Sequence, residues 1–164
     1  MPSFEPIVGR YISMVVAGDT VRIYVEEAGS GIPLVCLHTA GSDSRQFRHL
    51  MTDPSITDHY RVLAFDMPWH GKSNPPIGWR EIEYKLTTGL YKEIVVAFCQ
   101  AMELNRPAIM GCSMGGRIVL HLALEYPDDY RAVIALEGAD RLEPYYDTEW
   151  LHRPDVNGGE VAAG

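Results

Sequence analysis

The stretch 109–116 constrains the chain most, because it joins an apolar run to a helical pattern through one serine. Gly111, Ser113 and Gly115 stand at alternate positions in it. This G-x-S-x-G spacing is typical of a strand–turn–helix that holds a serine on a sharp turn. The two glycines have no Cβ, so neighbouring backbones can approach the turn closely. The pattern therefore predicts a strand that ends near Gly111 and a helix that begins at Met114.

The chain before this stretch contains a hairpin pattern and two apolar runs. Apolar residues alternate with polar or smaller neighbours over residues 12–16, and with arginine and tyrosine over residues 21–25, which predicts an antiparallel hairpin with one solvated face. Residues 33–37 are continuously apolar and residues 60–65 are apolar except for Arg61, as expected of strands covered on both faces. The remaining expected elements are helices over residues 43–51, 82–104 and 114–125, and a strand over residues 132–136.

The longest of these helices, residues 82–104, carries apolar side chains at helical spacing. Leu90, Ile94, Ala97 and Ala101 fall on one face, which we expect to pack on the sheet. Strands and helices alternate after the hairpin, and this order predicts an α/β fold. The expected architecture is a mostly parallel sheet flanked by helices, with an antiparallel N-terminal hairpin.

Size and charge exclude several function classes. The 164 residues are enough for one domain with a sizeable core, and the formal net charge of −8 argues against a nucleic-acid partner. No apolar run is long enough to cross a membrane, and residues 1–10 lack the pattern of a signal peptide. Cys36, Cys99 and Cys112 each lie inside an expected element, which predicts buried thiols rather than disulfides. We therefore expect a cytoplasmic protein with no membrane partner.

Three turns follow apolar strands in a specific order. They are LHTAGS at residues 37–42, DMPWHGKS at residues 66–73 and GCSMGG at residues 111–116. With these motifs the chain resembles the α/β-hydrolase fold superfamily, in its serine esterase and C–C hydrolase branch. The resemblance covers residues 11–140 and corresponds to the N-terminal half of that fold. One departure is Thr39, since the family usually has glycine after the histidine.

The resemblance implies a nucleophile and an oxyanion hole. Ser113 corresponds to the nucleophile, whose hydroxyl attacks a carbonyl once a base takes its proton. The backbone N–H groups of Met114 and Ala40 would then stabilise the oxyanion. The alternatives are a helix N-cap serine and two ordinary residues of a loop and a helix start.

The acid and base of the expected triad are harder to assign. The family order is serine, then acid, then a histidine after the last strand. Asp140 is our candidate for the acid and Glu137 a second one, although both could be solvated turn acids. The chain's histidines at other turns and helices do not occupy the position of the family's base: His38, His70, His121 and His152. Asp66 and Ser73 are expected to stabilise their loop, and Trp69 to line a pocket or pack.

The expected domain organisation follows from the resemblance. Residues 1–140 correspond to the N-terminal part of the hydrolase core, and residues 141–164 to the start of a cap segment or a truncated tail. We favour a fragment, because the strand 132–136 would otherwise leave a bare parallel edge. The sequence has no metal-ligand spacing, dinucleotide fingerprint or P-loop, so we expect no cofactor and no metal.

The leading hypothesis is a serine hydrolase that acts on a carboxylic ester, a lactone or a related acyl compound. Its partner would be a small-molecule acyl substrate. The alternatives are a C–C bond hydrolase or a cofactor-free haloperoxidase with the same machinery, and a non-catalytic binder or receptor that keeps the fold. The sequence leaves the substrate and the oligomeric state open.

Overall fold

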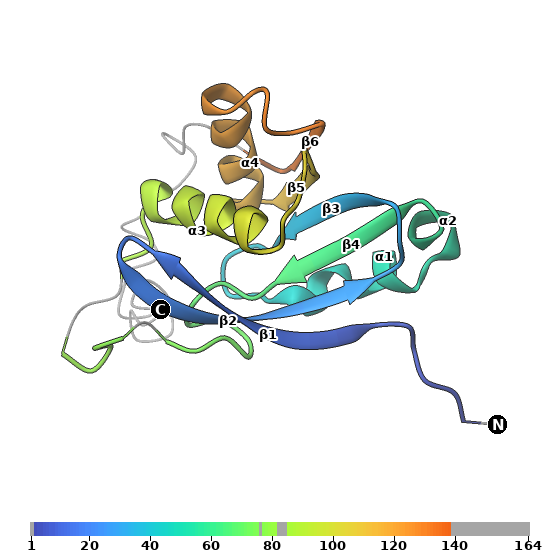
Figure 1. The fold of residues 1–164 in the computed structure, drawn as a ribbon, viewed down its shortest axis with the longest axis horizontal. Helices are drawn as coiled ribbons and strands as arrows, with labels where there is room; N and C mark the ends of the chain where they lie inside the picture. The colour runs from blue at the N-terminus through green and yellow to red at the C-terminus, as the bar shows by residue number, and fades with distance from the viewer. Residues whose placement is uncertain (1, 76, 82–84, 139–164) are drawn as a thin grey trace, which may run out of the picture.

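The computed structural model describes residues 2–75, 77–81 and 85–138 (Figure 1). Six strands alternate with helices after an initial hairpin. In chain order the elements are β1 (Val8–Val16), β2 (Asp19–Ala28), β3 (Ile32–Leu37), the 3₁₀ helix η1 (Ser44–Phe47), α1 (Arg48–Thr52), α2 (Pro54–Thr57), β4 (Tyr60–Phe65), α3 (Thr88–Ala101), β5 (Ala108–Cys112), α4 (Met114–Glu125) and β6 (Ala132–Leu136).

The six strands form one mixed sheet in the order β1-β2-β4-β3-β5-β6. β1 pairs with β2, and β2 with β4, in antiparallel orientation. The pairs β3–β4, β3–β5 and β5–β6 are parallel. The predicted fold class, a mostly parallel sheet with an antiparallel N-terminal hairpin, is therefore confirmed. Because β4, β3 and β5 are parallel neighbours, the three turns that follow them leave the same edge of the sheet.

The central strands are apolar except for Arg61 at the start of β4, because each of their two faces is covered. In β3, Val35 and Leu37 belong to the core under α3 and α4, whereas Leu34 and Cys36 belong to a second core with Phe47. β4 and β5 alternate between the same two cores. Figure 1 shows α3 and α4 together over one face, with α1 and α2 beside β4. Successive side chains of each strand enter opposite apolar cores, which explains why apolar residues follow one another without alternating with polar ones.

α3 differs from its expected bounds and from its expected buried face. The helix begins at Thr88, and the Thr87 side chain accepts a hydrogen bond from the Leu90 N–H, which makes Thr87 the N-cap. Its fully buried residues are Tyr91, Ile94, Val95, Phe98 and Cys99. The predicted face was therefore wrong at Ala101, which is exposed. The larger side chains at neighbouring positions turn the helix, because they remove more apolar area from water.

The segment between β3 and β4 contains one more helical turn than predicted. Asp43 caps η1 and accepts a hydrogen bond from the Arg45 N–H. A further turn, α2, then begins at Pro54, with the Asp53 side chain as its cap. Proline ends one helix but is well suited to the first position of another, because it has no N–H to leave unbonded. The Asp-Pro pair therefore separates two helices rather than closing the helical segment.

The cysteines and the last strand complete the fold. Cys36 and Cys99 are buried, as predicted, whereas Cys112 is only half-buried, and all three thiols are free. β6 pairs with β5 and, within the described residues, has no neighbour on its other side. Its apolar side chains Ile134 and Leu136 are 42% and 44% exposed. Among the described residues, none of the helices has the length and apolar character needed to span a bilayer.

Candidate active site

Ser113 lies between β5 and α4 in a conformation that non-glycine residues rarely adopt. Its φ is 52° and its ψ is −110°. The Ser113 N–H donates to the Leu136 carbonyl over 2.8 Å, so the end of β6 holds the turn. A Cβ on Gly111 would overlap the Gly115 carbonyl, which explains the glycine before the serine. The predicted strand–turn–helix and the start of α4 at Met114 are both confirmed.

The Ser113 side chain does not cap the helix that follows it. Ser113 occupies the N-cap position of α4, but its hydroxyl makes no hydrogen bond to the N–H groups of the first turn. The Ser113 carbonyl accepts the first helical hydrogen bond, from Arg117, at 2.9 Å. A capping serine would instead use its Oγ as the acceptor. The geometry therefore does not support the alternative that Ser113 serves as an N-cap.

The turn after β3 lies directly beside the Ser113 turn. Leu37 is paired with Gly111 in the parallel register of β3 and β5. A Cβ on Gly115 would lie 2.8 Å from the Leu37 Cβ and would overlap the Leu37 carbonyl. The second glycine of the motif is therefore needed because α4 starts in contact with the end of β3. This contact brings Ala40, three residues after Leu37, to the same edge of the sheet as Ser113.

Residues 39–42 form a β-turn. The Ser42 N–H donates to the Thr39 carbonyl over 3.3 Å, and Gly41 has a φ of 67°. A positive φ at the third position is typical of a type II turn and favours glycine there. Thr39 is not among the residues with positive φ, so threonine is tolerated where the family usually has glycine. Within the described residues, neither the Ala40 N–H nor the Met114 N–H donates a hydrogen bond.

His38 holds this turn from below and is fully buried. Its Nε2 accepts a hydrogen bond from the Met67 N–H over 3.1 Å, which leaves the proton on Nδ1. Nδ1 then donates to the Thr39 carbonyl over 2.8 Å. Burial lowers the pKa of His38 more than its bond to Thr39 raises it, so the neutral ring is favoured. Both ring nitrogens are used within the fold, so the role of His38 is structural.

Asp66 joins the turns after β3 and β4. Its carboxylate accepts hydrogen bonds from the Ser44 and Lys72 N–H groups, each over 2.7 Å. The Ser73 hydroxyl donates to the Asp66 carbonyl over 2.6 Å. A Cβ on Gly71 would overlap the Asp66 carboxylate, so only glycine fits there. The predicted stabilising role of Asp66 and Ser73 in their loop is therefore confirmed.

The comparison with known families agrees with this geometry. Residues 32–156, most of the chain, match the family described as alpha/beta hydrolase fold. The chain belongs to the α/β-hydrolase fold family. It is 26% identical to 2-hydroxymuconate semialdehyde hydrolase from Pseudomonas sp. strain CF600, over 93% of this chain and 52% of that protein. It is 36% identical to bifunctional epoxide hydrolase 2 from Sus scrofa, over 71% of this chain and 20% of that protein.

Solved structures show the same fold. The chain resembles the crystal structure of a protein from Burkholderia cenocepacia described as a putative aryl esterase, with a TM-score of 0.69 and 22% sequence identity. The match covers 83% of this chain and 49% of that chain. At this identity the likeness concerns the fold alone. The chain spans about half the length of the curated relatives that it matches over most of its own sequence.

Other residues of the hydrolase fold that the sequence singled out take different positions. Glu137 directly follows β6, is exposed and has a φ of 51°. The His70 ring lies 5.1 Å from the His38 ring, and its Nδ1 is 3.1 Å from the Pro68 carbonyl. Trp69 is 43% exposed and has a φ of 69°. Its ring packs edge-on against the Trp79 ring, with 5.3 Å between the ring centroids. Asp140 and His152 lie outside the described residues.

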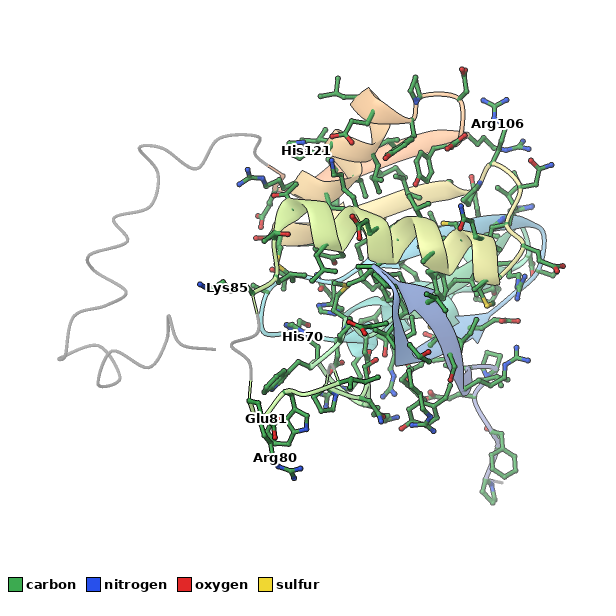
Figure 2. All side chains as sticks on the ribbon, turned by 60° about the vertical axis from the view of Figure 1, so that its left-hand side comes forward. His70, Arg80, Glu81, Lys85, Arg106 and His121 are labelled. Atoms are coloured by element: carbon green, nitrogen blue, oxygen red, sulfur yellow. The ribbon has the colours of Figure 1, made fainter. Side chains whose placement is uncertain are left out.

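Ser113 lines neither of two hollows in the described part of the chain. One, of about 220 Å³, is lined by charged groups that include Glu26, Asp43 and Asp66. The other, of about 270 Å³, includes Arg106 in its wall. Figure 2 shows Arg106 at the opposite end of α3 from His70 and Lys85. The described residues contain no group of three His, Cys, Asp or Glu side chains arranged to hold a metal ion.

One side chain of the site has no signal in the sequence. The Gln46 Oε1 accepts a hydrogen bond from the Thr39 N–H over 2.9 Å. Gln46 lies seven positions beyond Thr39, in η1, and its spacing to the turn follows no motif. The sequence showed only that threonine stands at residue 39, where the family usually has glycine. Only the folded chain shows which side chain contacts it.

Proposed function

We propose that the protein is a serine hydrolase that acts on a carboxylic ester, a lactone or a related acyl compound, with Ser113 as the nucleophile. The observation that carries the proposal is the positive φ of Ser113, a conformation that costs energy. Helix capping does not account for it, because the Ser113 side chain makes no capping hydrogen bond. Backbone strain of this kind persists where the surrounding structure fixes a residue for function. The strand–turn–helix supports this role, since it holds the hydroxyl out at the sheet edge.

The oxyanion would be stabilised by the N–H groups of Met114 and Ala40. Met114 is the first residue of α4, where N–H groups have no helical partner and the helix dipole favours negative charge. The Ala40 N–H lies in the neighbouring turn and is likewise free of hydrogen bonds to described residues. Each donor aimed at a developing oxyanion contributes about 3 kcal/mol to transition-state stabilisation.

The chemistry of a serine nucleophile favours acyl substrates over epoxides. Attack of Ser113 on an acyl carbon expels the leaving group and forms an ester, which water can then hydrolyse to the acid and the free serine. Attack on the saturated carbon of an epoxide would form an ether, which water does not cleave under the same conditions. The resemblance to the Sus scrofa epoxide hydrolase therefore supports the fold more than the reaction.

The proton transfers need a base and an acid. His38 uses both ring nitrogens within the fold, so it has none left for the Ser113 hydroxyl. We propose that the histidine and its carboxylate come from residues outside the described part of the protein, and Asp140 is the acid candidate within this sequence. We further propose a cytoplasmic protein with a small-molecule acyl substrate. The unpaired thiols of Cys36, Cys99 and Cys112 support a reducing compartment.

Labelling with a fluorophosphonate probe tests the proposed function. The probe phosphonylates a serine that is activated by a base and expels fluoride. We expect labelling of the full-length protein and its loss in Ser113→Ala, with labelling retained in Ser42→Ala as a control. An unlabelled but correctly folded full-length protein would reject the proposal and favour a non-catalytic binder.

A second candidate is hydrolysis of a carbon–carbon bond next to a carbonyl. It is favoured by the similarity to the Pseudomonas hydrolase of 2-hydroxymuconate semialdehyde, which covers 93% of this chain. The same serine and oxyanion donors serve both reactions, because both proceed through negative charge on a carbonyl oxygen. Product analysis with an aryl ester and with a 2-hydroxy-6-oxo dienoate separates the two candidates, since only one of them would be turned over efficiently.

A further inference from the structure

We propose that Gln46 is a positioning residue that fixes the direction of the Ala40 N–H. This inference rests on the proposed function, because the Ala40 N–H has a defined task only if an oxyanion forms beside Ser113. Gln46 acts through Thr39, the residue before Ala40, whose N–H it binds over 2.9 Å.

The direction of the Ala40 N–H is set by the peptide unit that it shares with the Thr39 carbonyl. In a planar trans peptide the N–H and the C=O point in opposite directions. The Thr39 carbonyl accepts hydrogen bonds from His38 Nδ1 over 2.8 Å and from the Ser42 N–H over 3.3 Å. Because both donors hold this carbonyl inside the turn, the Ala40 N–H faces away from them.

Gln46 holds the peptide unit on the other side of Thr39. A residue has only two soft backbone torsions, and they are fixed when the peptide planes on both sides are fixed. His38 and Ser42 hold the plane after Thr39, and Gln46 holds the plane before it. Without the Gln46 acceptor, Thr39 could rotate and carry the Ala40 N–H away from its direction. A displacement of about 1 Å at such a donor is enough to cost a large part of the rate.

The helical segment that carries Gln46 is itself fixed to the sheet edge. Its N-cap, Asp43, accepts from the Arg45 N–H and forms a two-point ion pair with the Arg45 guanidinium. The Gln46 N–H donates to the Asp43 carbonyl over 3.1 Å. The Ser44 N–H donates to the buried carboxylate of Asp66. The backbone of Gln46 is therefore anchored, and its side chain transmits this rigidity to Thr39.

Two substitutions of similar size separate the acceptor from the bulk of the side chain. Gln46→Met keeps the length and removes the carbonyl oxygen, whereas Gln46→Glu keeps an acceptor oxygen. Gln100→Met is the matched control, because Gln100 is an exposed residue of α3 that lines the hollow at the far end of the sheet. The measurements are kcat and KM for an aryl ester and the inhibition constant of an arylboronic acid, all in the full-length protein.

We expect Gln46→Met to lower kcat about tenfold and to leave KM within about twofold, because the Ala40 donor acts mainly in the transition state. Arylboronic acids form a tetrahedral anion on a serine, so their binding should weaken by a similar factor. Gln46→Glu should restore most of kcat, and Gln100→Met should match the wild type.

The outcomes distinguish this inference from the proposed function. If the wild type is labelled by a fluorophosphonate but Gln46→Met keeps its kcat and its boronic acid affinity, the role of Gln46 is rejected and the hydrolase remains. Equal losses in Gln46→Met and Gln46→Glu would also overturn the inference, since they would point to packing. A wild type that is neither labelled nor active rejects the proposed function and the role of Gln46 with it.

Discussion

Ser113 has a backbone conformation that non-glycine residues rarely adopt. Its φ of 52° and ψ of −110° are held from both sides, by the Leu136 carbonyl and by the first turn of α4. A non-glycine residue held in such a region costs about 1–3 kcal/mol. The strain lies in the backbone torsions of Ser113 and not in its hydroxyl. Substitution with glycine should therefore relieve it, whereas substitution with alanine should not.

Two substitutions of Ser113 test this strain. Both Ser113→Gly and Ser113→Ala remove the hydroxyl, but only glycine relieves the backbone. We expect Ser113→Gly to be more stable than Ser113→Ala by about 1 kcal/mol, because part of the relief is offset by the greater entropy of glycine in the unfolded chain. Urea unfolding of both variants measures the difference. Equal midpoints would show that the turn is not strained.

At the scale of elements, α4 approaches the sheet through its first-turn glycines. Gly115 is in contact with Leu37 of β3, and a Cβ on Gly116 would lie 2.7 Å from the Leu136 carbonyl of β6. One short helical turn is thus in contact with two strands on either side of β5. The close approach aligns the N-terminus of α4 with the turn after β3, as two oxyanion donors on separate elements require.

Replacing Gly115 with alanine tests this approach. The added Cβ would meet the Leu37 backbone, which cannot move without moving β3, so Gly115→Ala should destabilise the fold by about 1–3 kcal/mol. Gly89→Ala in α3 is the matched control. Gly89 has only the Thr87 Oγ1 nearby, at 3.8 Å, and alanine there should stabilise the helix by about 0.5 kcal/mol. Thermal unfolding of both variants measures the contrast, and a neutral Gly115→Ala would contradict the close contact.

At the scale of the whole molecule, a buried charge network joins the hairpin to the loops at the sheet edge. Glu26 of β2 is 2% exposed and forms a two-point ion pair with Arg48 of α1, with distances of 3.0 Å and 2.5 Å. The Lys72 ammonium, in the turn after β4, lies 3.9 Å from the same carboxylate. One buried carboxylate therefore holds three parts of the chain that are far apart in sequence.

The pH dependence of stability tests this network. Burial alone raises the pKa of Glu26, but the hydrogen bonds and charge of Arg48, with Lys72, outweigh it and hold the pKa below its ordinary value of 4.5. The unfolded chain therefore binds the proton more readily. The stabilisation is complete above about pH 4.5 and is lost as the pH falls toward the folded pKa.

Glu26→Gln should remove this part of the acid dependence. We expect the variant to be less stable than the wild type by about 1–3 kcal/mol at pH 7, where Arg48 loses a charged partner, with a smaller difference below pH 4.5. The exposed Glu93→Gln in α3 is the matched control and should follow the wild-type curve. Denaturant unfolding between pH 3 and pH 7 measures both. A constant difference across this range would contradict the charge network.

The sequence by itself determined which segments are strands, their order along the chain and the place of the Ser113 turn. Apolar runs predicted β3, β4 and β5, and the spacing of Gly111 and Gly115 predicted both the turn and the start of α4. These features are local, because they depend on periodicity and on the sterics of a few adjacent residues. The meeting of the three turns at one sheet edge could be inferred from this strand pattern, since neighbouring parallel strands place their carboxyl ends together.

Only the tertiary structure decided which groups meet across those turns. The buried face of α3 was set by the size of Tyr91 and Phe98 against the sheet, and not by the apolar period alone. The tautomer of His38 depends on the Met67 N–H, 29 positions away. The bond from Thr39 to Gln46 likewise depends on where η1 lies after the chain has folded. Hydrogen bonds between segments are fixed by three-dimensional distance, on which the local pattern of residues carries no information.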